Sequence, residues 1–392
     1  MKKPKIRFKG CTDAWEQRKV GDIFKVTRGY VLPATETDAE LSQEKPFPVY
    51  SSQTKDNGLM GYYSDYLYED AITWTTDGAN AGTVNYRAGK FYCTNVCGVL
   101  LSDKVKATKA ISEALNLVAK KYVSYVGNPK LMNNVMADIN IMIPSLEEES
   151  EAIASYFLQL DHLITLHQRK CEEIKTLKRY MLQKMFPENG MKVPQIRFKG
   201  YANAWEQRKL GELVRFSKGT GYSKSDLKEK GTPIILYGRL YTKYETIISE
   251  VDTFADEKPS SVYSVGGEVI VPASGETAED ISIASVVDKS GVLLGGDLNI
   301  ITPPDNLDSA FLAISISNGK PHNDMAKMAQ GKSVVHLHNS DLEKIDLTYP
   351  ALTEQTQISS YFSNLDNLIT LHQQKCNELQ NIKKFMLQNM FV

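Results

Sequence analysis

The 392-residue sequence lacks the marks of several protein classes. No apolar run approaches the roughly 18–20 residues that a membrane-spanning helix needs. The N-terminus, MKKPKIRFKG, is basic but has no apolar core of a signal peptide. Its five cysteines, an odd number without dense spacing, do not suit a disulfide framework. We therefore expect a protein of the reducing cytoplasm.

An excess of positive charge is also missing, because 46 Lys and Arg stand against 47 Asp and Glu. A global basic signal for nucleic-acid binding is thus absent. The charge is uneven, however: residues 1–30 hold nine Lys or Arg and three acids, whereas residues 220–349 are acidic. Binding to DNA would need local patches, or a partner that supplies more positive charge.

Catalytic motifs are not found either. The segment QGKSVV (330–335) has no glycine five residues before its Gly-Lys-Ser, so it is not a P-loop. The segment TPPD (302–305) lacks the first polar residue and the aromatic of the amino-methyltransferase loop, and no Gly-rich cofactor loop precedes it. We expect no ATPase, methyltransferase or nuclease chemistry, and no catalytic residues.

Metal ligands are few. Cys93 and Cys97 are four residues apart, and His336 and His338 flank a leucine. A zinc site built from these is conceivable, but packing within β-strands is favoured, since the spacing fits no common zinc finger. We expect no metal on this chain.

What the sequence does contain is a tandem duplication. PKIRFKGCTDAWEQRKVGDIFKVTRG begins at Pro4, and PQIRFKGYANAWEQRKLGELVRFSKG begins at Pro194. A second repeat, residues 156–186 and 361–391, has 19 identities in 31 positions. The middle segments, 30–143 and 220–349, show no resemblance beyond a strand, a glycine loop and a strand. The same two flanking segments therefore occur twice, each time around a different middle segment.

The second repeat predicts two long helices. Apolar residues recur in alternating steps of four and three, the spacing of a coiled-coil seam. A capping box at Ser145 and Glu148 predicts the start of the first helix, and Pro187 with Gly190 its end. At ~1.5 Å per residue, about 40 residues give a rod of roughly 60 Å. The predicted helix-pair interface comprises Ile153, Phe157, Leu160, Ile164, His167, Cys171, Ile174, Ile358, Phe362, Leu365, Ile369, His372, Cys376 and Leu379.

The two apolar seams should bury each other. Because each helix ends where a middle domain begins, an antiparallel pair related by a pseudo-twofold axis is predicted. His167 and His372 are interpreted as polar residues that fix the register, with a ligand pair as the alternative. The repeated IRFKG segments are interpreted as joints in which Phe8 and Phe198 pack. Phosphate contact by Arg7 and Arg197 is the minor alternative.

The middle segments read as α/β. Strand-like runs lie at 232–240, 267–273 and 281–287, and helical patterns lie at 110–123 and 309–318.

The layout resembles the specificity subunit of a type I restriction–modification system. The resemblance lies in INIMIPSLEEESEAIASYFLQLDHLI (139–164), IDLTYPALTEQTQISSYFSNLDNLI (345–369) and AWEQRKLGEL (204–213). One departure is EEESEAI in the first copy, with no Glu-Gln pair where the second copy has TEQTQI. The resemblance implies an α/β (α+β) fold of two globular target recognition domains separated by a pair of long antiparallel coiled-coil helices. The expected divisions are a first recognition domain (1–143), a central helix (144–190), a second recognition domain (191–349) and a distal helix (350–392).

The resemblance also implies a non-catalytic DNA-binding role. Each domain would read one half of a bipartite, asymmetric DNA site, and the helices would set the gap. Methyltransferase (M) subunits would methylate adenine with S-adenosylmethionine, and restriction (R) subunits would use ATP and Mg²⁺, so no cofactor is expected on this chain. A non-DNA adaptor, with two ligand-binding domains on a coiled-coil spacer, is the alternative that the neutral net charge supports.

Candidate DNA contacts lie in glycine-containing loops and near basic residues. Asn80 could read a base, Arg87 a phosphate or guanine, and Glu276 could accept from cytosine; ordinary turn chemistry explains the first loop equally well. Contacts to the phosphate–sugar backbone of DNA could come from Arg239, Tyr241, Lys332 and Ser333. The full set of candidates is Gly78, Asn80, Gly82, Arg87, Arg239, Tyr241, Ser274, Glu276, Thr277, Lys332 and Ser333.

Overall fold

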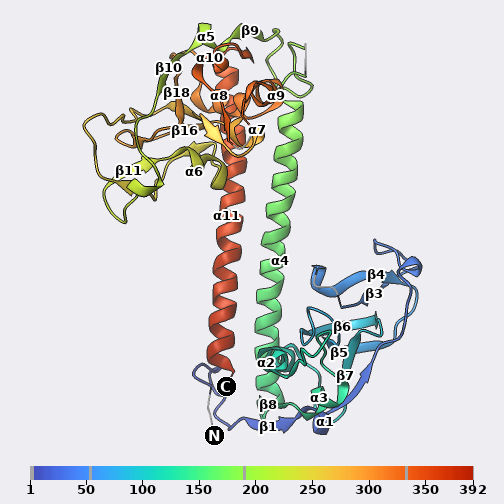
Figure 1. The fold of residues 1–392 in the computed structure, drawn as a ribbon. Coiled ribbons are helices and arrows are strands. Elements are labelled where there is room, and N and C mark those ends of the chain that lie inside the picture. Colours follow the sequence, from blue (N-terminus) through green and yellow to red (C-terminus); the bar gives the residue numbers. More distant parts are fainter. Residues whose placement is uncertain (1–3, 53–54, 189–190, 332–333, 392) are drawn as a thin grey trace. The chain divides into compact units, whose positions relative to one another are not determined.

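The computed structural model describes residues 4–52, 55–188, 191–331 and 334–391 (Figure 1). Internal contacts divide the chain into two compact units. The first unit is Met1–Gln168 with Gln373–Val392, and the second is Arg169–His372. Among the described residues, no helix is both long enough and apolar enough to cross a membrane.

Two long helices, α4 (Glu147–Lys184) and α11 (Leu352–Met390), each contribute a segment to both units. In the first unit, the ring of Phe391, just beyond α11, lies 5.9 Å from that of Phe157 in α4. Further along the same pair, Lys383 Nζ lies 2.7 Å from Asp161 Oδ1. Numbers that rise on one helix therefore fall on the other, and the predicted antiparallel pairing is confirmed.

The second unit repeats this pairing at equivalent positions. Phe186, just after α4, has its ring 6.2 Å from that of Phe362 in α11. Lys178 Nζ lies 2.5 Å from Asp366 Oδ1. Lys178 and Lys383 occupy seam positions, and each lysine pairs with the aspartate of the Leu-Asp motif in the other copy.

The predicted seam coincides with the buried side of both helices. Ile153, Phe157, Leu160 and Leu379 share one buried cluster in the first unit. Cys171 and Cys376 are buried, and His167 and His372 are half-buried. The remaining predicted seam residues are buried or half-buried as well: Ile164, Ile174, Ile358, Phe362, Leu365 and Ile369.

The predicted start of the first helix was one residue early. The helix α4 begins at Glu147, and the Leu146 carbonyl accepts the Ser150 N–H at 3.3 Å. Leu146, not Ser145, therefore stands at the cap position. At the other end the helix stops at Lys184, before Pro187, while Gly190 lies outside the described residues.

The first unit contains a six-stranded sheet. Its strands, in order across the sheet, are β2 (Phe24–Arg28), β7 (Cys97–Ser102), β5 (Tyr68–Thr75), β6 (Val84–Cys93), β3 (Phe47–Tyr50) and β4 (Leu59–Tyr63). Neighbours are antiparallel except β6 and β3, which are parallel. The helix α2 (Lys109–Ala119) packs on β6 and against α4, where Ala110 joins the cluster of Phe157.

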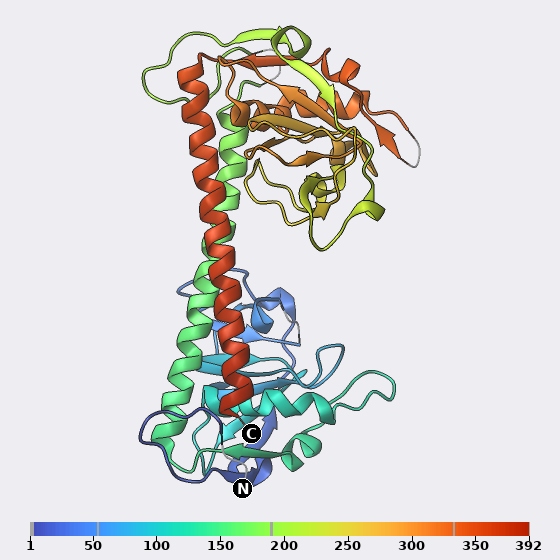
Figure 2. The ribbon, with the colours of Figure 1, turned by 90° about the vertical axis from the view of Figure 1, so that its left-hand side faces the viewer.

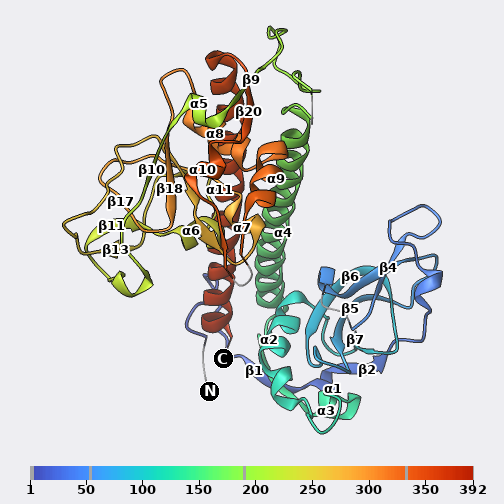
Figure 3. The same ribbon diagram turned by 45° about the horizontal axis from the view of Figure 1, so that its top comes forward.

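The second unit contains a five-stranded sheet and a smaller three-stranded one (Figure 3). The larger sheet has the order β10 (Arg215–Lys218), β18 (Leu298–Thr302), β14 (Glu268–Pro272), β16 (Ser285–Val287) and β12 (Ile247–Ile248). The smaller has the order β13 (Phe254–Ala255), β11 (Thr232–Ile235) and β17 (Leu293–Leu294). The helix α8 (Ser309–Ile316) packs on β14 and β16.

Five strands have the same order and direction in both units. When β4 is left out and the strands are numbered in chain order, each sheet has the order first, fifth, third, fourth, second. Three neighbouring pairs are antiparallel and the last pair is parallel. The middle segments, which show no resemblance in sequence, therefore share a five-stranded core.

Most local predictions hold. The helices expected at 110–123 and 309–318 correspond to α2 and α8. The strand expected at 232–240 is wrong in its second half, because β11 ends at Ile235 and α6 (Tyr237–Thr242) follows. The strand expected at 281–287 is also shorter, because α7 (Ala278–Ile281) precedes β16.

Each repeated N-terminal segment forms a joint with the ends of both long helices. In the first unit, Arg7 donates two hydrogen bonds to Glu149 at 2.8 and 2.6 Å, and the Glu149 side chain is only 1% exposed. In the second, Arg197 donates to Glu354 at 2.6 and 2.7 Å, again with a carboxylate 1% exposed. The arginines are therefore structural, and the predicted joint role prevails over phosphate contact.

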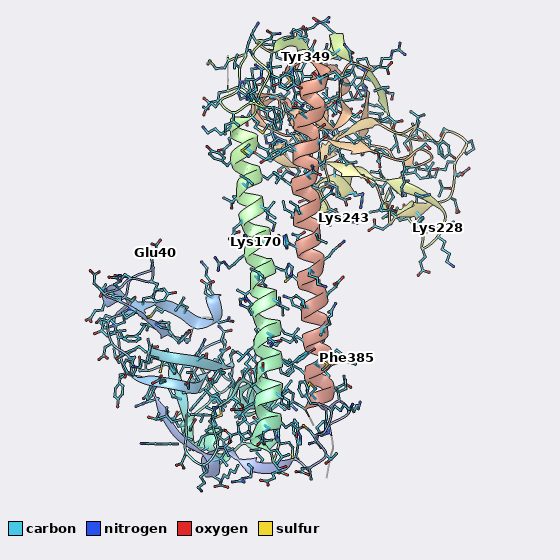
Figure 4. The ribbon with its side chains drawn as sticks, turned by 180° about the vertical axis from the view of Figure 1, so that it is seen from behind. Glu40, Lys170, Lys228, Lys243, Tyr349 and Phe385 are labelled. Carbon is cyan, nitrogen blue, oxygen red and sulfur yellow. The ribbon has the colours of Figure 1, made fainter. Side chains whose placement is uncertain are left out.

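The joints also share aromatic and backbone contacts. Phe8 packs on Tyr156 and Phe198 on Tyr361, each with ring centroids 6.2 Å apart, as predicted for the two phenylalanines. Behind the joints, β1 (Glu16–Lys19) pairs with β8 (Asn140–Ile143), and β9 (Glu206–Lys209) pairs with β20 (Asp346–Tyr349). Tyr349, labelled in Figure 4, closes the latter pair by donating to Glu206 at 3.2 Å.

The two units differ in the charges around the seam lysine. In the first unit, Lys383 pairs with Asp161 and Glu113, and Lys109 pairs with the same two acids at 2.8 Å each. Burial acts to lower the pKa of Lys383, but the two acids hold it above its ordinary value. In the second unit, Asp366 instead accepts a hydrogen bond from Thr246 at 3.1 Å. In the first unit, α2 is therefore connected to both long helices by the alternating charges of Lys109, Glu113, Asp161 and Lys383.

The joint yields a stability prediction. Replacing Arg7 by alanine leaves the buried Glu149 carboxylate without its cation, and should lower the free energy of unfolding by about 3 kcal/mol. The matched control is Arg18→Ala, which removes an exposed pair with Glu16 and should change stability little. Denaturant unfolding measures both; equal effects of the two substitutions would contradict a stabilising role for the buried pair.

Candidate nucleic-acid interface

The candidate loops lie at one topological position in the two units. Residues 76–83 connect β5 to β6, and residues 273–284 connect β14 to β16. In both sheets these are the third and fourth strands of the shared five. Both loops contain residues predicted from the sequence to contact DNA: Gly78, Asn80 and Gly82 in the first, and Ser274, Glu276 and Thr277 in the second.

A hairpin pairs with each loop. In the first unit, Ser124 and Lys130 exchange backbone hydrogen bonds at 2.8 and 2.9 Å. In the second, Gln330 and His336 do so at 3.1 and 2.9 Å. Hairpin 124–130 and hairpin 330–336 thus close loops of equal length; residues 332 and 333 lie outside the described part of the latter.

The hairpins are anchored to the loops in the same way. The Leu131 N–H donates to the Thr76 carbonyl at 2.8 Å, and the Leu337 N–H donates to that of Ala273 at 3.0 Å. Both leucines are fully buried, and each leucine carbonyl accepts a side-chain hydrogen bond. The donors are Trp74 at 3.1 Å and Asn299 at 2.9 Å.

Local charge favours a polyanionic ligand at these hairpins. Residues 114–137 hold three lysines and no acid, and residues 325–340 hold two lysines, two histidines and no acid. Loop 273–284 carries three acids, Lys327 pairs with Asp324 at 3.7 Å, and Lys332 lies outside the described residues, so the basic character of the second hairpin rests on its sequence. These are the local patches that a chain of net charge −1 requires for contact with phosphates.

The glycines of loop 76–83 have conformational roles. Gly78 and Gly82 have φ values of +90° and +81°, which favour glycine. A Cβ on Gly82 would lie 2.8 Å from Val123 Cγ2, at the base of the hairpin. Turn chemistry thus accounts for both glycines. Asn80 is half-buried, and its backbone carbonyl accepts the Thr83 N–H at 3.1 Å.

Arg87 is not available to DNA. Its residue is 7% exposed, and its guanidinium donates to Thr73 Oγ1 at 3.0 Å and to the Asn57 carbonyl at 2.8 Å. It also lies 3.7 Å from the centre of the Tyr50 ring. The predicted phosphate or guanine contact is therefore wrong, because the side chain is part of the interior.

In the second unit, the loop candidates surround the start of α7. Ser274 is buried, and its Oγ lies 3.0 Å from Nδ1 of the exposed His336. Thr277 caps α7 in a capping box with Asp280. Glu276 is exposed, which leaves its carboxylate accessible.

The residues predicted to contact the DNA backbone differ in how accessible they are. The Arg239 side chain is 8% exposed and pairs with Glu245 at 2.6 Å and Asp252 at 3.2 Å, so its charge is already neutralised. Its predicted phosphate contact is wrong for that reason. Tyr241 is half-buried, and burial together with neighbouring acids raises its pKa. Lys332 and Ser333 lie outside the described residues.

The cysteines and histidines do not form a metal centre in the described residues. Cys93 and Cys97 belong to the first unit, whereas His336 and His338 belong to the second. Cys93 and Cys97 are buried at the ends of β6 and β7, and burial raises the pKa of Cys97 to about 11. No group of three or more His, Cys, Asp or Glu that could hold a metal occurs in the described ranges.

Sequence reasoning missed hairpin 124–130. In Figure 2 the segment after α2 projects from the sheet, and its tip residues Tyr125 and Val126 are 71% and 93% exposed. The signal in the sequence is the composition of 114–137, which is basic and free of acids, but the first part of this segment has the pattern of an ordinary helix.

Comparisons with known proteins agree with this geometry. The family model described as type I restriction modification DNA specificity domain matches residues 12–176 and 203–381. The MjaVIII specificity subunit of Methanocaldococcus jannaschii is 22% identical, over 94% of this chain and 90% of that protein. The MpnII specificity subunit of Mycoplasma pneumoniae is 35% identical over 39% of this chain.

The chain spans about half the length of several of the curated M. pneumoniae relatives that it matches. A solved S subunit of a type I restriction–modification system from M. genitalium has a TM-score of 0.71, with 14% identity, and the match covers 100% of this chain and 99% of that one. That likeness shows the fold. The named relatives are specificity subunits, which are non-catalytic components of such systems.

Proposed function

Because this chain belongs to the type I restriction modification DNA specificity family, we propose that it reads a bipartite, asymmetric DNA site for partner subunits. One half-site is read by the loop and hairpin of each unit. Partner M subunits then methylate an adenine in each half-site with S-adenosylmethionine. Partner R subunits restrict unmodified DNA, using ATP and Mg²⁺.

One observation carries this proposal: two loops at equivalent positions in the two units have unlike residues. Loop 76–83 and loop 273–284 occupy the same position between strands but share little sequence. Equivalent loops with unlike contact residues suit a protein that recognises two different half-site sequences in one DNA molecule.

The test is methylation of DNA in cells. Expressed with its M subunit, the chain should direct adenine methylation to a two-part site whose halves are not inverted repeats; expressed alone, it should leave DNA unmodified. Single-molecule methylation mapping detects both outcomes. Failure of the complex to bind or modify any DNA would favour the adaptor alternative.

We also infer that the long helices set the gap between the half-sites. The helices α4 and α11 are continuous over 38 and 39 residues, so their length is fixed by hydrogen bonding. Lys178 and Lys383 pair with fixed aspartates, which favours one register.

Inserting one heptad after Ile174 and another after Leu379 tests this role. The insertions should lengthen the pair by about 10 Å, roughly three base pairs. The half-site words should be kept, while the preferred gap grows or modification is lost. Methylation mapping gives the gap directly; an unchanged gap with full modification would exclude a measuring role.

The duplication further supports docking of two identical M subunits. In the first unit, the exposed large apolar side chains of α4 and α11 include four whose repeat equivalents are exposed in the second unit. The residues are Leu163, Leu166, Ile382 and Phe385 in the first unit, and Leu368, Leu371, Leu177 and Tyr180 in the second. Exposed apolar side chains repeated in this way suit two copies of one partner.

Replacing Phe385 and Tyr180 by serine should weaken assembly with the M subunit. Each exposed ring would contribute on the order of 1.5–3 kcal/mol if the partner buries it fully. Co-purification and light scattering measure the stoichiometry, and thermal unfolding of the free chain should be little changed. The control is Tyr263→Ser, an exposed tyrosine of the second unit that is not on the helices. Assembly lost equally in the control would contradict docking on these faces.

A further inference from the structure

The tip of hairpin 124–130 is the most exposed apolar element of the first unit. Val126 is 93% exposed and Tyr125 is 71% exposed. Tyr122 and Met132, on either side of the hairpin, are exposed as well. Single exposed apolar residues are common, but a group on one short segment marks a binding surface.

This tip is held firmly by its surroundings. Ser124 and Lys130 close the hairpin, and the Gly78 N–H donates to the Pro129 carbonyl at 2.9 Å. Below them, the Leu131 carbonyl accepts from the buried Trp74. A tip positioned by the sheet loses little conformational entropy on binding, which favours a role in recognition.

The charges around the tip indicate its ligand. Lys120 and Lys121 are exposed just before the hairpin, and residues 114–137 contain no acid. Lys130 lies 3.5 Å from Asp77, which leaves Lys120 and Lys121 to meet phosphates. An apolar tip beside lysines matches DNA, in which phosphates flank the bases.

A two-stranded ribbon fits the major groove, which is about 12 Å wide, and not the minor groove of about 6 Å. The apolar group that base edges present there is the C5-methyl of thymine. We propose that Val126, with Tyr125 beside it, contacts a thymine methyl in the first half-site and that Lys120 and Lys121 contact the flanking phosphates. This assignment rests on the proposed function and adds a specificity-determining residue to it.

The experiment uses the full chain in complex with its M subunit and a duplex that contains the mapped site. Each thymine of the first half-site is replaced in turn by uracil, which lacks only the methyl group. For the chain without substitutions, one thymine-to-uracil replacement should weaken binding about fourfold, the value of one buried methyl. With Val126→Ser, which removes both side-chain methyl groups at an exposed position, binding to thymine DNA should fall similarly and uracil should cost nothing further.

Two controls define the result. Val265→Ser alters a valine that is 76% exposed before β14, at the other end of that strand from loop 273–284, and should preserve the uracil effect. Lys120→Gln with Lys121→Gln should weaken thymine and uracil duplexes equally and reduce the salt dependence by about two phosphate contacts.

Three outcomes would overturn the assignment. These are the absence of a uracil effect in the first half-site, the same effect with and without Val126→Ser, and loss of the M subunit from the Val126→Ser complex. The last would mean that the tip docks protein. If the unmodified complex binds no DNA at all, the proposed function fails instead.

Discussion

A carboxylate withdrawn almost completely from water must meet a cation where it lies, and Glu149 and Glu354 impose this requirement on each unit. Both are 1% exposed at the start of a long helix, and a bidentate arginine from the repeated N-terminal segment reaches each of them. The two joints differ at the indole of their tryptophan. Trp15 also donates to Glu149 at 3.3 Å, whereas Trp205 Nε1 has no hydrogen-bond partner among the described residues. The second joint therefore depends more fully on its arginine.

The long helices were predictable because their constraint is local and periodic. A seam in steps of four and three specifies which side is buried, so Phe157 and Phe362 could be assigned from sequence alone. The partners of the seam lysines could not. Lys178 and Lys383 read as interruptions of the apolar pattern, and only the antiparallel register brings them to Asp366 and Asp161. A charge tolerated at a seam position is explained by the opposite helix, which a single copy of the repeat does not reveal.

The shared core of the middle segments was not predictable for a different reason. A buried strand requires apolar side chains but few particular ones, so β5 and β14 can differ throughout and still occupy the same place in a sheet. The positions that resist change are those in which backbones approach closely. Gly29 and Gly219 follow β2 and β10, and a Cβ on either would lie about 2 Å from a carbonyl oxygen of the facing segment. These glycines lie at the end of the repeated sequence. After them, the two middle segments have the same order of strands but different residues.

The candidate site divides along the same line. Arg87 and Arg239 attracted attention as cations, yet both serve the interior of their own domains, because a guanidinium satisfies several acceptors at once. What remains at the surface is carried by loops and hairpins whose backbones are fixed by buried neighbours. Since Leu131 and Leu337 anchor hairpins of equal length in both units, the tip residues can vary without disturbing the fold. Under the proposed function, two equivalent domains with independently variable loops would let one chain recognise two unrelated DNA sequences. The asymmetry of the site would then follow from surface residues alone.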